Sequence, residues 1–296
     1  MQHRQIRCTL PAQACAFVEP VLLNQGAYAV TLQDPGGEPI LEPDLGTNPL
    51  WDTVVVMALF DGDANVSHIR SRLEETLGDG IIRDWREETI PDQDWERAWM
   101  DAFEPMRFGK RLWVCPSTHS PPDPKAITIR LDPGLAFGTG SHPTTSLCLS
   151  WLDRQQLEGA RVLDYGCGSG ILAIGALLLG AAQAHGVDND RQALLASRDN
   201  AQRNGVSARL FLHGAEEPAL PVAEVLVANI LSGTLIELAP RLTALIRPGG
   251  RVALSGILEQ QTGAVTAAYA DHVDFDRPRF KDGWTLLPGV RRSGAM

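Results

Sequence analysis

The sequence predicts two domains, a small ferredoxin-like α+β domain followed by a Rossmann-like α/β domain. Three observations lead to this prediction. With 296 residues, the chain is long enough for about two domains. The first ninety residues alternate strand and helix patterns in the order βαββαβ. The second half repeats strand and helix patterns with apolar strands, which is typical of a mostly parallel sheet covered by helices on both faces.

The first domain is expected to span residues 1–90. Two amphipathic segments end at Gly26 and Gly78, and glycine is typical of helix ends. A Pro- and Gly-rich loop separates the second strand from the third. This order predicts a four-stranded antiparallel sheet with both helices on one face. The expected strands are 5–10, 27–34, 52–60 and 81–90, and the expected helices are 14–26 and 66–78.

A connecting region is expected at 91–119, and the second domain at 120–296. Asp94 to Phe103 has the pattern of a linker helix, in which Trp95 and Trp99 share one face. Further expected strands are 111–117, 126–132, 160–166, 184–188, 208–214, 222–230, 251–257, 272–280 and 284–290. Expected helices are 171–180, 191–205, 235–246 and one near 260–270, with a turn at 247–250.

The composition is that of a globular protein, with 44% hydrophobic and 21% charged residues. No apolar run approaches the roughly 20 residues that span a bilayer, and the N-terminus lacks the apolar core of a signal peptide. We therefore expect a cytoplasmic protein that does not bind membranes. The five cysteines and seven histidines show no metal-ligand spacing, so we expect reduced thiols and no metal site. The pattern gives no indication of the oligomeric state.

Acidic residues are concentrated in the first part of the chain. Residues 1–120 contain 10 Lys and Arg against 19 Asp and Glu, a net charge of −9, whereas the whole chain carries −10. An acidic surface repels phosphate backbones and attracts basic partners. This part is expected to need no direct nucleic-acid contact and to favour a basic protein ligand, although a merely solvated surface is an alternative.

A glycine-rich segment, LDYGCGSG, follows the first strand of the second half. Its spacing is Asp-x-Gly-x-Gly-x-Gly, made by Asp164, Gly166, Gly168 and Gly170. In such sheets ligands bind outside the carboxyl ends of the strands, where glycine lets the backbone approach the ligand closely. A dinucleotide fingerprint would need Gly or Ala at the position of Ile171. The segment therefore favours a nucleotide-derived ligand without a pyrophosphate.

Two polar residues end later strands of the predicted sheet. Asp188 can accept hydrogen bonds from both ribose hydroxyls of an adenosine-bearing cofactor. NAD and S-adenosylmethionine both fit this role, and the glycine spacing favours S-adenosylmethionine. Alternatively, Asp188 caps the next helix, although Asp190 can do so instead. Asn229 ends the fourth strand, above which the reactive end of the cofactor should lie, but a single Asn at a strand end is not specific.

Several segments together resemble the ribosomal protein L11 methyltransferases, the PrmA family. The resemblance extends into the first part of the chain through LWDTVVVMALFD and DWERAWMDAFEPMRFGKRLWVCPS. In place of the Asn-Pro-Pro-Tyr of methylases that act on amide or base nitrogens, this chain has Asn-Ile-Leu, as the family does. The segments of the second part are LDPGLAFGTGSHPTTSLCLSWLD, VLDYGCGSGILAIGALLLGA, GVDND, ASRDNAQRNGV and VLVANILSGTLIELAP.

The resemblance implies a class I methyltransferase fold and a second loop over the cofactor. In the family the AFGTGSHPTT segment closes over S-adenosylmethionine from the side opposite the glycine-rich loop. Asn229 is expected to be catalytic, because its side-chain oxygen would accept a hydrogen bond from the attacking amine. For His142 no family role follows, and a turn residue is expected. The expected cofactor-binding residues are Phe137, Gly140, Thr144, Thr145, Asp164, Gly166, Gly168, Gly170, Asp188 and Asn229.

The resemblance also implies the reaction and the partner. The family's enzymes transfer methyl groups from S-adenosylmethionine to lysine side chains and the N-terminal amine of a basic large-subunit ribosomal protein. Their small N-terminal domain recognises that substrate, which agrees with the charge of −9 in residues 1–120. Movement at the linker would let one active site reach several amines.

Three other functions stay open at this point. An NAD-linked dehydrogenase is disfavoured by Ile171. A methyltransferase for RNA or another protein target is disfavoured by Asn-Ile-Leu and by the acidic first domain. A non-catalytic, cofactor-binding ribosome-assembly factor would keep the same motifs and differ only in having no turnover.

Overall fold

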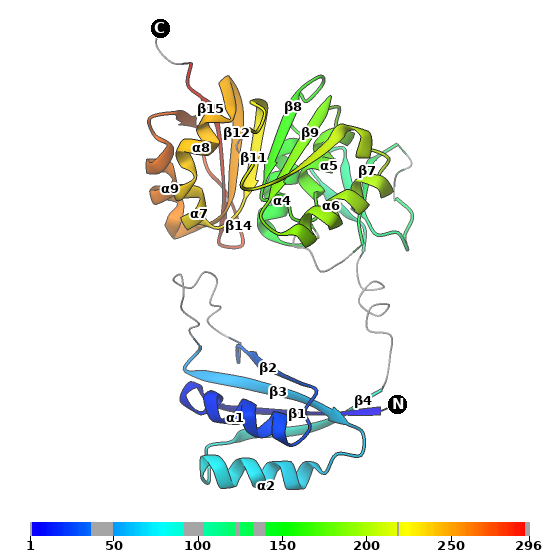
Figure 1. The fold of residues 1–296 in the computed structure, drawn as a ribbon, viewed down its shortest axis with the longest axis vertical. Helices are drawn as coiled ribbons and strands as arrows, with labels where there is room; N and C mark the ends of the chain where they lie inside the picture. Colours follow the sequence, from blue (N-terminus) through cyan, green and yellow to red (C-terminus); the bar gives the residue numbers. More distant parts are fainter. Residues whose placement is uncertain are drawn as a thin grey trace. The chain divides into compact units, whose positions relative to one another are not determined.

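The computed structural model describes residues 2–36, 50–91, 104–121, 123, 125–132, 140–217 and 219–293. The chain forms two compact units, residues 1–95 and 96–296, which are coloured blue to cyan and green to red in Figure 1. The expected linker helix, Asp94 to Phe103, lies outside the described residues. Within the described residues, no helix has the length and apolar character needed to cross a membrane.

The first unit is a four-stranded antiparallel sheet in the order β2-β3-β1-β4. Both helices lie on one face of it (Figure 1). This arrangement confirms the predicted ferredoxin-like fold. Its elements are β1 (Gln2–Pro11), α1 (Ala12–Asn24), β2 (Ala29–Gln33), β3 (Thr53–Asp61), α2 (Val66–Leu77) and β4 (Arg83–Pro91).

Alternation along the strands builds the core of this unit. Ile6, Cys8 and Leu10 of β1 point to the same face and are each 1% exposed. They pack with Val18 and Leu22 of α1, which are fully buried. The residues between them face away from the helices, and the unit therefore keeps its charged side chains on its outer surfaces.

The second unit is built on an eight-stranded sheet in the order β10-β9-β8-β11-β12-β15-β13, with β14 paired to β15. The first five strands are parallel, and β15 is antiparallel to β12 and β13. The strands are β8 (Arg161–Tyr165), β9 (Gln183–Asp188), β10 (Leu210–Gly214), β11 (Ala223–Asn229), β12 (Ile246–Leu258), β13 (Val273–Phe275), β14 (Arg279–Lys281) and β15 (Trp284–Arg291).

Helices cover both faces of this sheet, as Figure 1 shows. Successive residues of a strand point to opposite faces, so Val225 and Val227 pack in one core whereas Leu226 and Ala228 pack in another. The first core includes α4 (Pro143–Leu152), α5 (Ile171–Leu178) and α6 (Arg191–Arg203). The second core includes α7 (Ser232–Glu237), α8 (Ala239–Ala244) and α9 (Thr262–Tyr269). Two 3₁₀ turns, Ser207–Arg209 and Glu259–Gln261, complete the connections. The predicted Rossmann-like layers are confirmed.

A small three-stranded sheet packs on the α4 and α5 side. It consists of β5 (Met106–Phe108), β6 (Leu112–Cys115) and β7 (Ile127–Arg130) in the order β5-β6-β7. Leu112, Val114 and Ile129 are fully buried in the first core. This sheet therefore belongs to the same compact unit as the large sheet.

The structure corrects four of the expected elements. The strand expected at 272–280 is two short strands, β13 and β14, which pair with different parts of β15. The helix α4 begins at Pro143, inside a segment that was expected only as a cofactor-covering loop. The expected helix 235–246 is two helices that meet at Leu238, because Pro240 cannot donate the backbone hydrogen bond that would continue the first helix. The expected turn 247–250 lies within β12 as an irregularity in its pairing with β11, and Gly249 there has φ +73°.

Candidate functional site

A pocket of about 420 Å³ opens at the carboxyl ends of four parallel strands. Its lining includes Tyr165, Asp188, Ala215 and Ile230, which end or directly follow β8, β9, β10 and β11. The chain proceeds from β8 to β9 and β10 on one side, and then returns to place β11 on the other side of β8. The pocket therefore lies at the topological switch point, where ligands of open α/β sheets bind.

The glycine-rich loop connects β8 to α5 beside this pocket. Gly166 has φ +78°, and a Cβ there would lie 2.1 Å from Cγ2 of Ile230. Gly170 has φ +79° and precedes the first residue of α5. A Cβ on Gly170 would lie 2.8 Å from Oγ of Ser197. Glycine is required at both positions, since a side chain would be strained and would collide with its neighbour.

Asp188 connects the end of β9 to the glycine-rich loop. Its Oδ2 accepts a hydrogen bond from the Gly168 N–H at 2.8 Å, and its Oδ1 accepts one from the Asp190 N–H at 3.0 Å. The helix cap is Asp190, whose Oδ1 accepts from the Gln192 N–H at 2.8 Å. Asp188 is therefore not the cap of α6, and it lines the pocket. Each of its oxygens has a further lone pair with which to accept a hydroxyl hydrogen.

Asp164 lies inside the sheet rather than on the pocket wall. Its side chain is fully buried, and Oδ2 accepts a hydrogen bond from the Ala173 N–H of α5 at 3.0 Å. Burial raises the pKa of this carboxyl to about 7, and the nearby charge of Asp188 adds to the increase. Among the described residues, its Oδ1 has no hydrogen-bond partner. Asp164 thus fixes the start of α5 beneath the loop.

The start of α4 contacts the end of β11. Nδ2 of Asn229 donates a hydrogen bond to Oγ1 of Thr145 at 3.4 Å, across 84 positions of sequence. Thr144 and Thr145 are each 1% exposed. Gly140 is buried with φ +93°, and a Cβ there would lie 3.6 Å from Cδ1 of Ile171 in α5. The fold thus brings the described end of the second expected loop, from Gly140 to Thr145, against the end of β11 and the start of α5.

Phe137 lies outside the described residues. His142 caps α4, and its ring Nδ1 accepts a hydrogen bond from the Thr144 N–H at 3.4 Å. Burial lowers the pKa of His142, which favours the neutral ring, and Nδ1 also lies 2.7 Å from Oγ1 of Thr144. His142 was expected to be a turn residue, and in the structure it is the N-cap residue directly before α4.

The sequence did not single out two further side chains near the start of α4. The ring of Trp284 lies 4.9 Å from that of His142 in an edge-to-face arrangement. Lys281 donates from Nζ to Oγ of Ser146 at 2.8 Å. Both residues lie at the β14 to β15 turn, where Trp284 pairs with Leu258 of β12, just past the carboxyl ends of the parallel strands. No sequence motif marks them, because their proximity depends on the antiparallel strand that returns to this edge.

Residues of the site fit an adenosine-bearing ligand. Gly166 and Gly170 lie where there is no space for a Cβ, so the backbone of this loop can approach a ligand closely. The carboxylate of Asp188, at the end of β9, lines the adjacent pocket. This combination, on a sheet with one antiparallel strand inserted next to its edge, is the arrangement of a Rossmann-like S-adenosylmethionine-dependent methyltransferase.

Comparison with known proteins identifies the family. The family described as ribosomal protein L11 methyltransferase (PrmA) matches residues 2–292. The proteins named ribosomal protein L11 methyltransferase from Ectopseudomonas mendocina and from Azotobacter vinelandii are each 54% identical over 294 residues, which cover 99% of this chain and 100% of each relative. The chain therefore belongs to the ribosomal protein L11 methyltransferase family, and the expected resemblance is confirmed.

A solved structure agrees with this assignment. The ribosomal protein L11 methylase from Lactobacillus delbrueckii subsp. bulgaricus has a TM-score of 0.59 and 29% sequence identity to this chain. The similarity covers 64% of this chain and 98% of that one. Methyltransferase activity with S-adenosylmethionine as the donor, expected from the sequence, follows from membership of the family.

Proposed function

We propose that the protein transfers methyl groups from S-adenosylmethionine to lysine side chains and the N-terminal amine of ribosomal protein L11. The observation that carries this proposal is the contact between Asn229 and Thr145, at 3.4 Å. This contact holds the Asn229 amide at the end of β11, directly before Ile230 of the pocket lining and next to the start of α4. An amide oxygen can accept a hydrogen bond from an amine without competing with it as a nucleophile.

Residues from two sides of the pocket bind the cofactor. Gly166, Gly168 and Gly170 form the cradle on one side, and Asp188 accepts hydrogen bonds from the ribose hydroxyls. Gly140, Thr144 and Thr145 contact the cofactor from the side of α4, and Asp164 supports the loop from beneath. Phe137 is assigned to the same covering segment by the resemblance alone.

Asn229 positions the acceptor amine. The bound donor supplies a methyl group that is already activated by its positive sulfur. A lysine amine has a reference pKa of about 10.4, so it is protonated at pH 7 and must lose a proton before it attacks. Desolvation and the neighbouring positive charge both lower that pKa. Because Nδ2 of Asn229 donates to Thr145, Oδ1 is the atom of this amide that accepts a hydrogen bond from the neutral amine. Water removes the proton.

The first unit supplies the docking surface for the substrate. This unit makes up most of residues 1–120, in which acidic side chains exceed basic ones by nine, and L11 is expected to be basic. Opposite charges increase the rate of encounter and orient the two proteins. The charge of −9 supports the prediction that residues 1–90 recognise the substrate and residues 120–296 transfer the methyl group. These roles stay predictions. A cytoplasmic location also stays a prediction.

The test is methyl transfer from labelled S-adenosylmethionine to purified ribosomal proteins, followed by intact-mass and fragment analysis of the labelled protein. We expect several methyl groups on one basic protein, at lysine residues and the N-terminus. Label in RNA, or on glutamine, would overturn the acceptor assignment. Cofactor binding without any transfer would indicate a non-catalytic assembly factor.

A further inference from the structure

The last two turns of α6 hold the glycine-rich loop by its carbonyl groups. Oγ of Ser197 donates to the Gly168 carbonyl at 2.8 Å, and Nδ2 of Asn200 donates to the Ser169 carbonyl at 2.9 Å. Ser197 is fully buried and Asn200 is 8% exposed. Because a peptide group is planar, a fixed carbonyl also fixes the direction of the next residue's N–H. These two bonds therefore set the peptide planes on both sides of Ser169.

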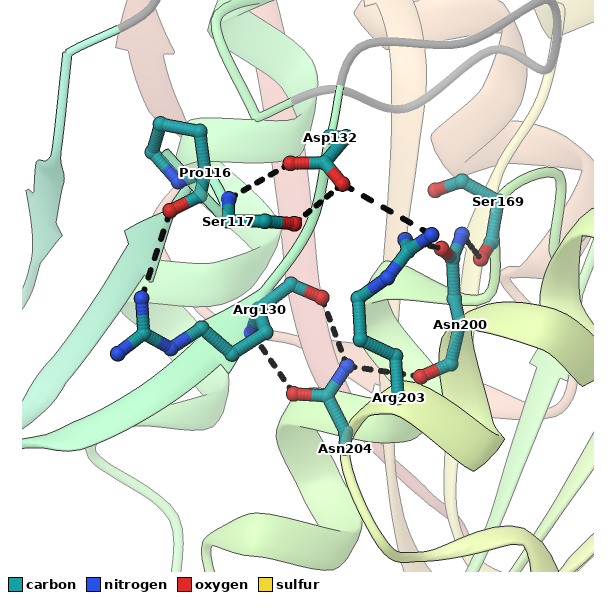
Figure 2. Close-up of polar contacts among 8 residues, drawn as sticks. All are labelled: Pro116, Ser117, Arg130, Asp132, Ser169, Asn200, Arg203 and Asn204. Carbon is teal, nitrogen blue, oxygen red and sulfur yellow. Dashed lines mark hydrogen bonds and ion pairs between the residues drawn. The ribbon is translucent and has the colours of Figure 1, made fainter. Parts of the chain in front are cut away.

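Arg203 fixes which way the Asn200 amide faces. Its Nη1 donates to Oδ1 of Asn200 at 2.8 Å, so that Nδ2 is the atom directed at Ser169 (Figure 2). Nη2 of Arg203 lies 3.8 Å from Oδ2 of Asp132. The Ser117 N–H and hydroxyl both donate to Asp132. Although burial alone would raise the pKa of Asp132, these hydrogen bonds and the charges of Arg203 and Arg130 lower it. Asp132 therefore stays ionised and holds the Arg203 guanidinium.

Asn204 caps the carboxyl end of α6 and serves a different contact. Its Oδ1 accepts from the Arg130 N–H at 2.7 Å, and its Nδ2 donates to the Arg130 carbonyl at 2.8 Å. These bonds join α6 to the end of β7, and Figure 2 shows that they lie apart from Ser169. Nδ2 of Asn204 also donates to the backbone carbonyl of Asn200 at 2.8 Å, but it does not contact the Asn200 side chain that holds Ser169. Asn204 is therefore a control of the same residue type for the side-chain contact of Asn200.

We propose that Asn200, oriented by Arg203, is a positioning residue that preorganises the glycine-rich loop for the cofactor. The inference rests on the proposed function only through the identity of the cofactor. Glycine residues give a loop many alternative backbone conformations, and ordering them on binding reduces affinity. The amide of Asn200 selects one of these conformations before the cofactor arrives. Its loss is expected to act on cofactor affinity and much less on the transfer step.

The decisive variant is Asn200→Asp, which keeps the shape of the side chain but puts an acceptor against the Ser169 carbonyl. Calorimetry with S-adenosylhomocysteine should give affinity lower by about tenfold, as expected for the loss of one buried hydrogen bond. The KM for S-adenosylmethionine should rise by a similar factor while kcat stays within about twofold. In the protein without cofactor, amide hydrogen exchange of 166–170 should become faster.

Two further variants make the test specific. Asn204→Asp should lower thermal stability yet leave S-adenosylhomocysteine affinity within about twofold. Arg203→Met removes a side chain that is 39% exposed, so folding is retained. Its affinity for S-adenosylhomocysteine should fall by about threefold because the Asn200 amide can rotate.

Equal losses of affinity in Asn200→Asp and Asn204→Asp would overturn the proposal. No loss of affinity in Asn200→Asp or in Arg203→Met would also overturn it. If the unmodified protein bound no S-adenosylhomocysteine, the proposed function would fail instead.

Discussion

At the scale of single residues, Ile230 joins the cofactor loop to the expected catalytic amide. Its Cγ2 occupies the space that a side chain on Gly166 would need, and it directly follows Asn229. Ile230 also lines the pocket at the switch point. A change at Gly166 should therefore be transmitted to Asn229 through one packed side chain, although Gly166 follows β8 and Asn229 ends β11.

Gly166→Ala is expected to lower both stability and cofactor affinity. The residue has φ +78°, which costs a residue with a side chain about 1 kcal/mol or more, and its Cβ would collide with Ile230. Gly159 is the control, because it has φ +71° and no atom of the described residues lies within 4 Å of the position that a Cβ would take. Urea unfolding and S-adenosylhomocysteine binding should show a larger loss for Gly166→Ala. Equal effects of the two substitutions on both measurements would show that the contact with Ile230 is unimportant.

Asn229→Ala should reduce kcat on L11 by about 100-fold, as expected for a group that positions a reacting atom. S-adenosylhomocysteine binding should change much less, because Gly166, Gly168, Gly170 and Asp188 remain. The measurement is steady-state methyl transfer with circular dichroism as the control for folding. An unchanged kcat in a folded protein would remove Asn229 from the mechanism.

At the scale of elements, two histidines connect the strands β9 and β10. Nδ1 of His185 lies 3.0 Å from Nε2 of His213, and Nδ1 of His213 lies 2.8 Å from Oε2 of Glu217. The ring of His185 also stacks on Phe211. Burial lowers the pKa of His185 to about 4, and the nearby His213 and Arg161 contribute to the decrease. His185 therefore stays neutral in the folded protein as the pH falls from 6.5 toward 4.

This pKa makes stability depend on pH. The unfolded chain protonates the histidine near pH 6.5, whereas the folded protein does so only near pH 4. His185 therefore contributes its full share to the free energy of unfolding above pH 6.5, and this contribution is lost as the pH falls toward 4. Between pH 7.5 and pH 5 the free energy of unfolding should fall by about 2 kcal/mol because of this group. Urea unfolding of His185→Gln at these two pH values should show a smaller loss than the unmodified protein. The same loss in both proteins would contradict the assignment.

The order of elements was predictable because hydrophobic periodicity distinguishes strands from helices. The start of α4 was not, since Gly140 and Pro143 give the local pattern of a loop. At the site, spacing alone selected the glycine-rich loop and Asp188, and their roles stay predictions. The contacts of Asn200 and Trp284 were beyond sequence reasoning, because each depends on which distant element packs beside it.

At the scale of the whole molecule, charge is divided between the two parts of the chain. Residues 1–120 carry −9 and the remainder only −1. If the acidic part attracts the substrate, added salt should screen that attraction, because the Debye length falls from about 10 Å at 0.1 M to about 3 Å at 1 M. We expect the KM for L11 to rise several-fold between 0.05 and 0.5 M salt.

Cofactor affinity supplies the control for that measurement. The pocket that we propose for the cofactor is formed within the second unit, so binding of S-adenosylhomocysteine should depend much less on salt. A KM for L11 that does not change with salt would contradict electrostatic docking, whatever the identity of the methylated amines.

The position of β15 has a consequence for how the protein is made. β15 pairs with β12 on one side and with β13 on the other, yet it follows both in the sequence. As the chain leaves the ribosome, β13 emerges before the strand it pairs with, and the edge of β12, which carries the apolar Val252 and Leu254, stays open. Unpaired apolar edges are templates for aggregation. A released chain that lacks β15 should therefore need chaperone protection, whereas a chain that includes residues 284–291 can close its own sheet.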